Sequence, residues 1–171
     1  MKTVGIKGLL ALALLALLGV ANADVAVQET EDAARELQVA DFSTKLLNAV
    51  NAKRSAKGLA AVCINKKLMK AAQVLADDMA KNNFVGTKGT DGSTPTTRAK
   101  AQHMAISSSA ELVAAGQSSA DSVVETWIKS SSAYIYSDLP FIGPGYKYDK
   151  TKTYKHYWVL DFADGEGEVC A

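Results

Sequence analysis

The 171-residue sequence has few cysteines and lacks the short motifs of several common enzyme classes. Its two cysteines do not form a Cys-x-x-Cys pair, which argues against a reactive dithiol. The glycine-containing stretch 84–98 has no Gly-Lys-Ser/Thr ending, so it is not a phosphate-binding loop. The serine clusters at 107–109 and 130–132 lie outside any Gly-x-Ser-x-Gly context and are typical of loops. Dithiol redox chemistry, a phosphate-binding loop and serine hydrolysis are therefore not expected.

A long apolar run occurs only at the N-terminus. Lys2 and Lys7 precede an apolar stretch over 8–20, and Ala21-Asn22-Ala23 is a small-residue cleavage pattern. Because the run is too short to span a bilayer comfortably, we expect a signal peptide over 1–23, cleaved after Ala23. An uncleaved anchor is the alternative. The protein is therefore expected to be secreted and extracellular, without stable membrane insertion.

Charge is nearly balanced but unevenly distributed. From Asp24 onward the chain has 17 basic and 18 acidic residues, a net of −1. Residues 24–41 carry six acids against Arg35 alone, which favours a solvated tail or a loose propeptide before a domain over 42–171. The basic residues do not predict a patch interleaved with aromatics, so nucleic acid is not an expected partner.

Cys63 and Cys170 are expected to form a disulfide, because both lie in the exported part of the chain. The bridge would close a loop of more than 100 residues, which stabilises by roughly 4 to 5 kcal/mol in the chain-entropy model. It would hold the C-terminus beside the first helices.

The stretch from Tyr154 to Ala163 predicts a central strand. One parity carries large side chains at Tyr154, His156, Trp158, Leu160 and Phe162. The other parity includes Tyr157 and Val159, so both faces are partly apolar and need cover from helices.

Four helices are expected upstream, starting near Asp41, after Asn65, after Thr94 and at Ser119 or Ala120, where cap residues precede apolar residues at helical spacing. Residues 134–148 are expected to be extended, broken by Gly-Pro-Gly at 143–145, and to form an antiparallel hairpin with the central strand. This order predicts an α+β fold.

The succession of segments resembles the CAP superfamily, which includes cysteine-rich secretory proteins, antigen 5 and pathogenesis-related proteins of group 1. The segments that carry the resemblance are Leu-Leu-Asn-Ala-Val-Asn-Ala-Lys-Arg at 46–54, the 68–79 helix, Asp-Gly-Ser-Thr-Pro at 91–95, residues 111–117, the Trp127 helix and Tyr-Trp-Val-Leu-Asp-Phe at 157–162. The shorter microbial form is the most similar. The resemblance covers roughly Phe42 to Cys170, and it implies secretion and a three-layer α-β-α sandwich with a central antiparallel sheet.

The family's cleft typically presents two histidines and two acids that can hold a divalent metal. By position these fall here on Thr87 (or Gly86), Glu111, Ser130 and Ala133. Zinc needs three or four nitrogen, sulfur or oxygen ligands, and Glu111 is the one strong ligand left in this set. No metal or other cofactor is therefore expected, and whether His103 or His156 rebuilds a site stays open.

The resemblance makes a secreted, non-enzymatic CAP domain that binds a sterol, fatty acid or other lipid the leading hypothesis. The alternative is an extracellular protein-interaction module that uses loops at 84–98 and 130–139, with the acidic segment 24–41. A hydrolase is the third hypothesis, weakened by the absence of a nucleophile with an evident base. The surroundings of Glu111 distinguish a surviving polar site from a structural role.

Overall fold

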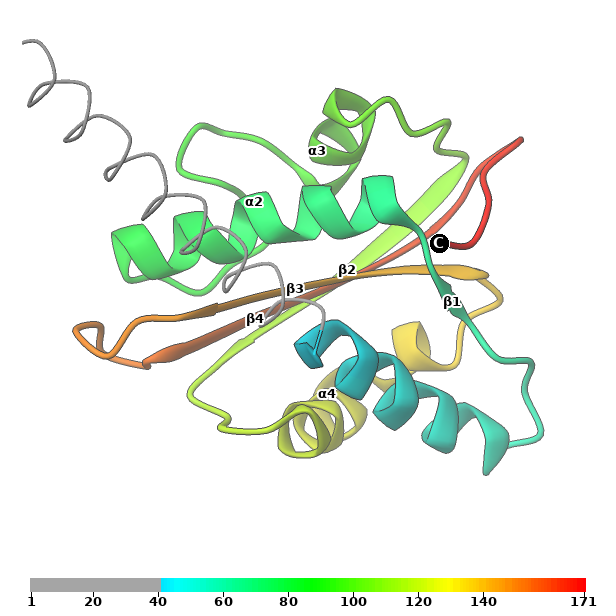
Figure 1. Cartoon of the computed structure of the whole chain (residues 1–171), viewed down its shortest axis with the longest axis horizontal. Helices are drawn as coiled ribbons and strands as arrows, with labels where there is room; N and C mark the ends of the chain where they lie inside the picture. The colour runs from blue at the N-terminus through cyan, green and yellow to red at the C-terminus, as the bar shows by residue number, and fades with distance from the viewer. Residues whose placement is uncertain (1–40) are drawn as a thin grey trace, which may run out of the picture. The chain divides into compact units, whose positions relative to one another are not determined.

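A computed structural model describes residues 41–171, which belong to the second of two compact units, Val39–Ala171. The expected signal peptide and residues 24–40 lie outside the described part. At the centre is a four-stranded sheet in the order β1-β3-β4-β2 (Figure 1). Its strands are β1 (Cys63–Ile64), β2 (Ser108–Ala115), β3 (Phe141–Tyr148) and β4 (His156–Asp164).

Helices cover both faces of this sheet (Figure 1). One face carries α2 (Lys66–Asn82) and α3 (Pro95–Ala101); the other carries the helix over residues 41–55 and α4 (Ala120–Ile135). The predicted caps are present, because Asn65, Thr94 and Ser119 each accept a hydrogen bond from an N–H of the following first turn. The predicted α-β-α sandwich of the α+β class is confirmed.

β4 lies inside the sheet and pairs antiparallel with β3 and β2. Trp158, Leu160 and Phe162 pack with the helix over 41–55 and α4, whereas Tyr157 and Val159 pack with α2. The predicted burial on both faces is confirmed, although the strand begins at His156 rather than Tyr154.

One pairing departs from a wholly antiparallel sheet. β1 runs parallel to β3, with Cys63 opposite Phe141 and Ile64 opposite Ile142. The helix over 41–55 lies on one face of the sheet and α2 on the other. β1 connects these two helices, and so links the two helical layers (Figure 1). The sheet is therefore mixed.

The Gly-Pro-Gly segment does not break β3, contrary to the sequence expectation. A Cβ on Gly143 would lie 2.3 Å from the carbonyl carbon of Leu68, and one on Gly145 would meet the next turn of α2 at 2.5 Å. Glycine thus lets α2 pack directly on the strand. Pro144 has no N–H to donate, and it lies beyond the two β3 residues that pair with β1.

α4 continues to Ile135, so the expectation of a loop over 130–139 is wrong for its first half. The helix is kinked at Ser131, where φ is −154° and ψ is 48°. The Ser130 hydroxyl donates to the carbonyl oxygen of Thr126 at 3.1 Å, a bond within the helix that replaces the loop contacts serine often makes.

The predicted disulfide joins Cys63 to Cys170 across a sequence separation of 107 residues. Beside it, the Ala171 N–H donates to the Ile64 carbonyl oxygen at 2.7 Å. The bridge and this hydrogen bond hold the C-terminus against β1. In the part of the chain described, no helix combines the length and apolar character needed to cross a bilayer.

Candidate functional site

The register of β2 against β4 sets two acidic residues side by side. Glu111 is the direct cross-strand partner of Asp161, and directly opposed residues of adjacent strands share a face. Their neighbours on that face, Val113 and Val159, pack with α2. Glu111 is 8% exposed and Asp161 is 1% exposed, so both carboxyl groups are removed from water.

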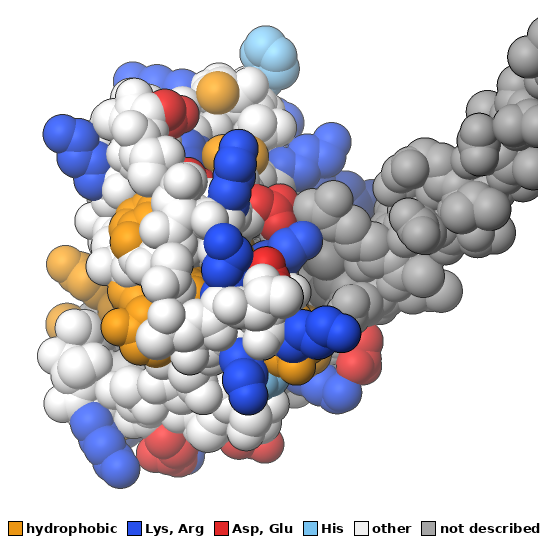
Figure 2. Space-filling model, turned by 90° about the vertical axis from the view of Figure 1, so that its left-hand side faces the viewer, with side chains coloured by type: hydrophobic (Ala, Val, Ile, Leu, Met, Phe, Trp, Pro, Cys, Tyr) orange, Lys and Arg blue, Asp and Glu red, His pale blue; other side chains and the backbone are white. Residues whose placement is uncertain are grey.

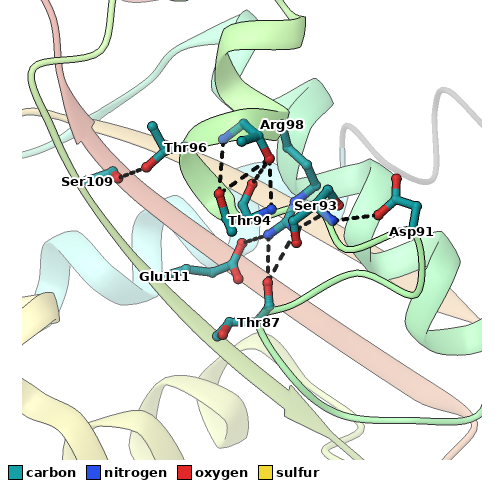
Figure 3. Close-up of polar contacts among 9 residues, drawn as sticks. Thr87, Asp91, Ser93, Thr94, Thr96, Arg98, Ser109 and Glu111 are labelled. Atoms are coloured by element: carbon teal, nitrogen blue, oxygen red, sulfur yellow. Dashed lines mark hydrogen bonds and ion pairs between the residues drawn. The ribbon is translucent and has the colours of Figure 1, made fainter.

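Arg98 of α3 supplies a cation to this pair (Figure 3). Its Nη2 lies 2.5 Å from Glu111 Oε2, and the two side chains are 3% and 1% exposed. The same guanidinium donates to the carbonyl oxygens of Thr87 and Ser93, in each case at 3.2 Å. One arginine therefore neutralises a buried acid and fixes the loop that precedes α3.

The cluster has one cation for two acids. Arg98 pairs with Glu111, so Asp161 has no cation of its own within the cluster. Burial raises the pKa of the Asp161 carboxyl well above its usual value, and Glu111 beside it adds to the increase, whereas Arg98 acts in the opposite direction. Two carboxylates with one guanidinium would bury a net negative charge, which is costly in a low-dielectric interior. Asp161 is therefore the group that keeps its proton.

The carboxyl oxygens of the cluster that lack a hydrogen-bond partner are consistent with a proton shared between Asp161 and Glu111. Within residues 41–171, Glu111 Oε1 and both carboxyl oxygens of Asp161 are buried without a hydrogen-bond partner. A protonated Asp161 that donates to Glu111 Oε1 would satisfy an atom on each side. The result is a neutral polar cluster inside the sandwich.

The four positions matched to the family cleft do not converge. Thr87 and Glu111 both contact Arg98, but Thr87 does so through its backbone carbonyl. Ser130 and Ala133 are exposed residues of α4, which covers the opposite face of the sheet. These four positions therefore offer no common coordination sphere.

Neither histidine faces Glu111. His156 has Nδ1 2.8 Å from the Tyr146 hydroxyl and lies on the face of β4 opposite to Asp161. Burial, with Lys155 adding to it, lowers the pKa of His156, and burial raises the pKa of Tyr146 to about 12. His103 is exposed, with φ of 58°, just after α3. Over residues 41–171 no group of three or more His, Cys, Asp or Glu side chains is placed to hold a metal.

Sequence reasoning missed Asp161 and Arg98. Asp161 gave a weak signal, since it is an acid in the middle of a strand whose neighbours are apolar on both parities. Arg98 gave none, because an arginine in a polar helix is ordinarily solvated. Only the tertiary arrangement brings Arg98 to Glu111.

An open groove of about 540 Å³ lies on the other side of the sheet, between the helix over 41–55 and the start of α4. Its lining consists of Phe42, Lys45, Asn48, Ala49, Ala52, Ser118, Ser119, Ala120 and Asp121. A smaller groove of about 260 Å³ beside α2 is lined by three aspartates, Asp77, Asp78 and Asp91, and reaches Arg98. Neither groove is lined by Glu111 or Asp161.

Comparison with known proteins gives a consistent result. Residues 47–162 match the model of the cysteine-rich secretory protein family, CAP. An outer surface protein of Borrelia burgdorferi has a TM-score of 0.67 and 20% identity, with 74% of this chain and 94% of that chain covered. No curated protein matches the chain by sequence.

Two further solved structures are similar over one part of their length. An extracellular SCP-domain protein of Bacillus anthracis has a TM-score of 0.60 and 17% identity, covering 70% of this chain and 39% of that one. A cysteine-rich secretory protein of Staphylococcus aureus has a TM-score of 0.53 and 18% identity, covering 69% and 36%. At these identities the likeness establishes the fold.

Proposed function

Because this chain belongs to the cysteine-rich secretory protein (CAP) family, we propose that it is a secreted, non-enzymatic domain that binds a lipid, and that this lipid is a sterol. The observation that carries the proposal is the groove of about 540 Å³ between the helix over 41–55 and α4. A volume of this size is within the usual range for small-molecule sites. The outer-surface and extracellular descriptions of the similar structures are consistent with secretion.

The lining of the groove mixes apolar and polar surface, which suits an amphipathic ligand with an uncharged head. Phe42, Ala49, Ala52 and Ala120 provide apolar surface. The polar groups are mainly neutral: Asn48, Ser118 and Ser119. The two charged side chains, Lys45 and Asp121, are of opposite sign, so the groove offers no net attraction to a fatty-acid carboxylate. A sterol hydroxyl needs only a neutral donor or acceptor.

The burial and hydrogen bonding of the polar residues support the proposal that the domain is not an enzyme. Glu111 and Asp161 are buried and line neither groove, so a substrate cannot reach them without local opening. Ser130, a member of the second serine cluster, donates its hydroxyl to a backbone carbonyl rather than to a base. A nucleophile would need such a base within hydrogen-bond reach.

Sterol binding is tested by titrating the chain from Asp24 with a fluorescent sterol and, separately, with a fluorescent fatty acid. We expect saturable micromolar binding of the sterol and at least about tenfold weaker binding of the fatty acid. Ala52→Trp should fill the groove and abolish sterol binding, whereas Ala133→Trp, on exposed α4 surface outside the groove, should not. Absence of saturable sterol binding, or equal loss in both variants, would contradict the proposal.

A second candidate function is recognition of an extracellular protein through the loop over 84–94. One observation favours it: the loop is exposed yet braced, with Asp78 accepting from Thr90 N–H (2.8 Å) and hydroxyl (2.7 Å) and Arg98 bonded to Thr87 and Ser93. A braced loop loses little entropy when it binds. Affinity capture from extracellular extracts by the chain with and without residues 24–40, and by Val85→Asp, would test it. Capture that is unaffected by Val85→Asp would argue against this surface.

A further inference from the structure

The turn between β3 and β4 forms a basic, tyrosine-containing projection at the end of the sheet (Figure 1). We call residues 147–156, Lys-Tyr-Asp-Lys-Thr-Lys-Thr-Tyr-Lys-His, the hairpin tip. Within these ten residues four lysines stand against one aspartate, a net of +3, although the chain from Asp24 onward has a net of −1. The sequence expectation that bases and aromatics do not interleave is wrong for this segment.

The hairpin tip presents its charges and rings to solvent. Lys150 and Lys155 are exposed, and Tyr148 and Tyr154 are 43% and 44% exposed. Figure 2 looks onto this end of the molecule and shows Lys and Arg side chains gathered over its middle. Two acids offset part of the charge: Asp149 within the turn, and Asp77, 3.7 Å from Lys147.

The tip is held in one conformation by contacts with the end of α2. Asn83 bonds to Thr153 through both its amide atoms, at 2.8 and 3.2 Å. Lys152 Nζ donates to the Lys81 carbonyl oxygen at 2.8 Å, and the Lys81 side chain adds a further positive charge at the base of the tip. A charged surface that is already ordered pays little conformational entropy when it docks.

Lys155 occupies a backbone conformation that lysine rarely adopts. Its φ is 62°, in the left-handed region where glycine or asparagine is favoured. Its carbonyl accepts from the Asp149 N–H at 2.8 Å, which closes the turn, and glycine would serve this bond equally well. A lysine in this position therefore points to a use for its side chain rather than to local folding.

We propose that the hairpin tip docks the protein on the surface of an anionic phospholipid bilayer. Lysines near such a surface each contribute roughly a fivefold factor to partitioning, and tyrosine is enriched at the headgroup level of membranes. The projecting shape favours a flat partner. Single-stranded nucleic acid is instead bound along a basic groove with bases stacked on aromatics, and a projection offers no such groove. The inference concerns the bilayer surface and is independent of sterol binding.

The experiment measures co-sedimentation of the chain from Asp24 with phosphatidylcholine vesicles that contain or lack phosphatidylglycerol. We expect binding to the anionic vesicles alone, reversed by high salt because the attraction is electrostatic. Changing Lys150, Lys152 and Lys155 together to glutamine should lower the partition coefficient on the order of 100-fold. Tyr148→Ser with Tyr154→Ser should lower it less and leave the salt dependence intact.

A matched control removes the same charge at the other end of the domain. Lys57 follows the helix over 41–55, and Lys66 and Lys70 lie in the first turns of α2, whereas the tip packs at the far end of that helix. Glutamine at these three positions should preserve most of the binding, with far-UV circular dichroism and the melting temperature confirming that both triple variants fold. Equal loss in the two variants, equal binding to neutral vesicles, or no vesicle binding would overturn the proposal. Tip-dependent binding to a single-stranded oligonucleotide without vesicle binding would also overturn it, in favour of nucleic acid.

Discussion

Asp161→Asn should make the protein more stable at neutral pH, and the gain should grow as pH rises. In the native protein burial and Glu111 raise the pKa of Asp161, so the folded state keeps a proton that the unfolded chain releases above about pH 4. Because the unfolded state binds fewer protons over this range, the free energy of unfolding falls with increasing pH. Asparagine has no proton to release, and its Nδ2 can donate to Glu111 Oε1.

The size of the effect follows from proton linkage. Each pH unit between the unfolded pKa and the raised native pKa costs the wild-type protein at most about 1.4 kcal/mol. If the native pKa lies above neutrality, the difference between variant and wild type increases by about 4 kcal/mol between pH 4 and pH 7. Above the native pKa the difference should become constant.

Urea denaturation of both proteins at a series of pH values from 4 to 9 measures this difference directly. Subtracting the two curves removes the contribution of the groups that the proteins share. Asp164→Asn is the matched control, since it makes the same chemical change at the exposed end of β4. It makes the change away from Glu111 and Arg98, so a pH-dependent gain in Asp161→Asn alone would locate the effect in the buried cluster.

Two results would refute the argument for a protonated Asp161. One is a stability difference that is independent of pH, which would mean that Asp161 has the same pKa folded and unfolded. The other is a loss of stability in Asp161→Asn of about 3 kcal/mol or more at pH 7, as expected when a buried charged pair loses one partner. That loss would identify Asp161 as an ionised acid that Arg98 compensates.

Three further substitutions test packing, backbone conformation and the disulfide. Gly143→Ala should destabilise by about 3 kcal/mol in urea denaturation, because its Cβ would meet the Leu68 backbone at 2.3 Å; a cost below about 1 kcal/mol would show that α2 moves freely. Lys155→Gly should raise the unfolding free energy by about 1 kcal/mol by relieving a φ of 62°, and an unchanged midpoint would contradict strain there. Replacing Cys63 and Cys170 together by serine should cost about 4 kcal/mol in the same assay, and the wild type treated with reductant should reproduce that loss.

Features that depend on neighbours in sequence were predictable. The parity of Trp158 and Tyr157 on the central strand, the caps Asn65 and Thr94, and the start of α4 follow from local periodicity and local hydrogen bonding. Each signal lies within a few residues of the element it specifies. Burial of both faces of β4 followed because the large side chains of that strand need cover.

Features that depend on register or on close backbone approach were not predictable. Glycine weakens most strands, but Gly143 instead leaves room for α2 to pack on β3. Only the position of α2 distinguishes the two roles. The serines at 130–132 lie within α4, where the Ser130 hydroxyl donates to the Thr126 carbonyl oxygen and the helix kinks at Ser131. The pairing of Glu111 with Asp161 depends on register across 50 residues, and a shift of one residue would put one of the acids on the other face.

The residues at the family's other cleft positions, Thr87, Ser130 and Ala133, do not surround Glu111. Arg98 explains how this acid is nevertheless buried. An isolated carboxylate at that depth would be costly, and the Arg98 guanidinium lies within ion-pair distance of Glu111. The same guanidinium also donates to the carbonyl oxygens of Thr87 and Ser93, so it ties the loop before α3 to the buried acid. The buried cluster thus ties α3 and the loop before it to the sheet, whereas recognition is proposed for the groove beside α4, the exposed loop over 84–94 and the hairpin tip.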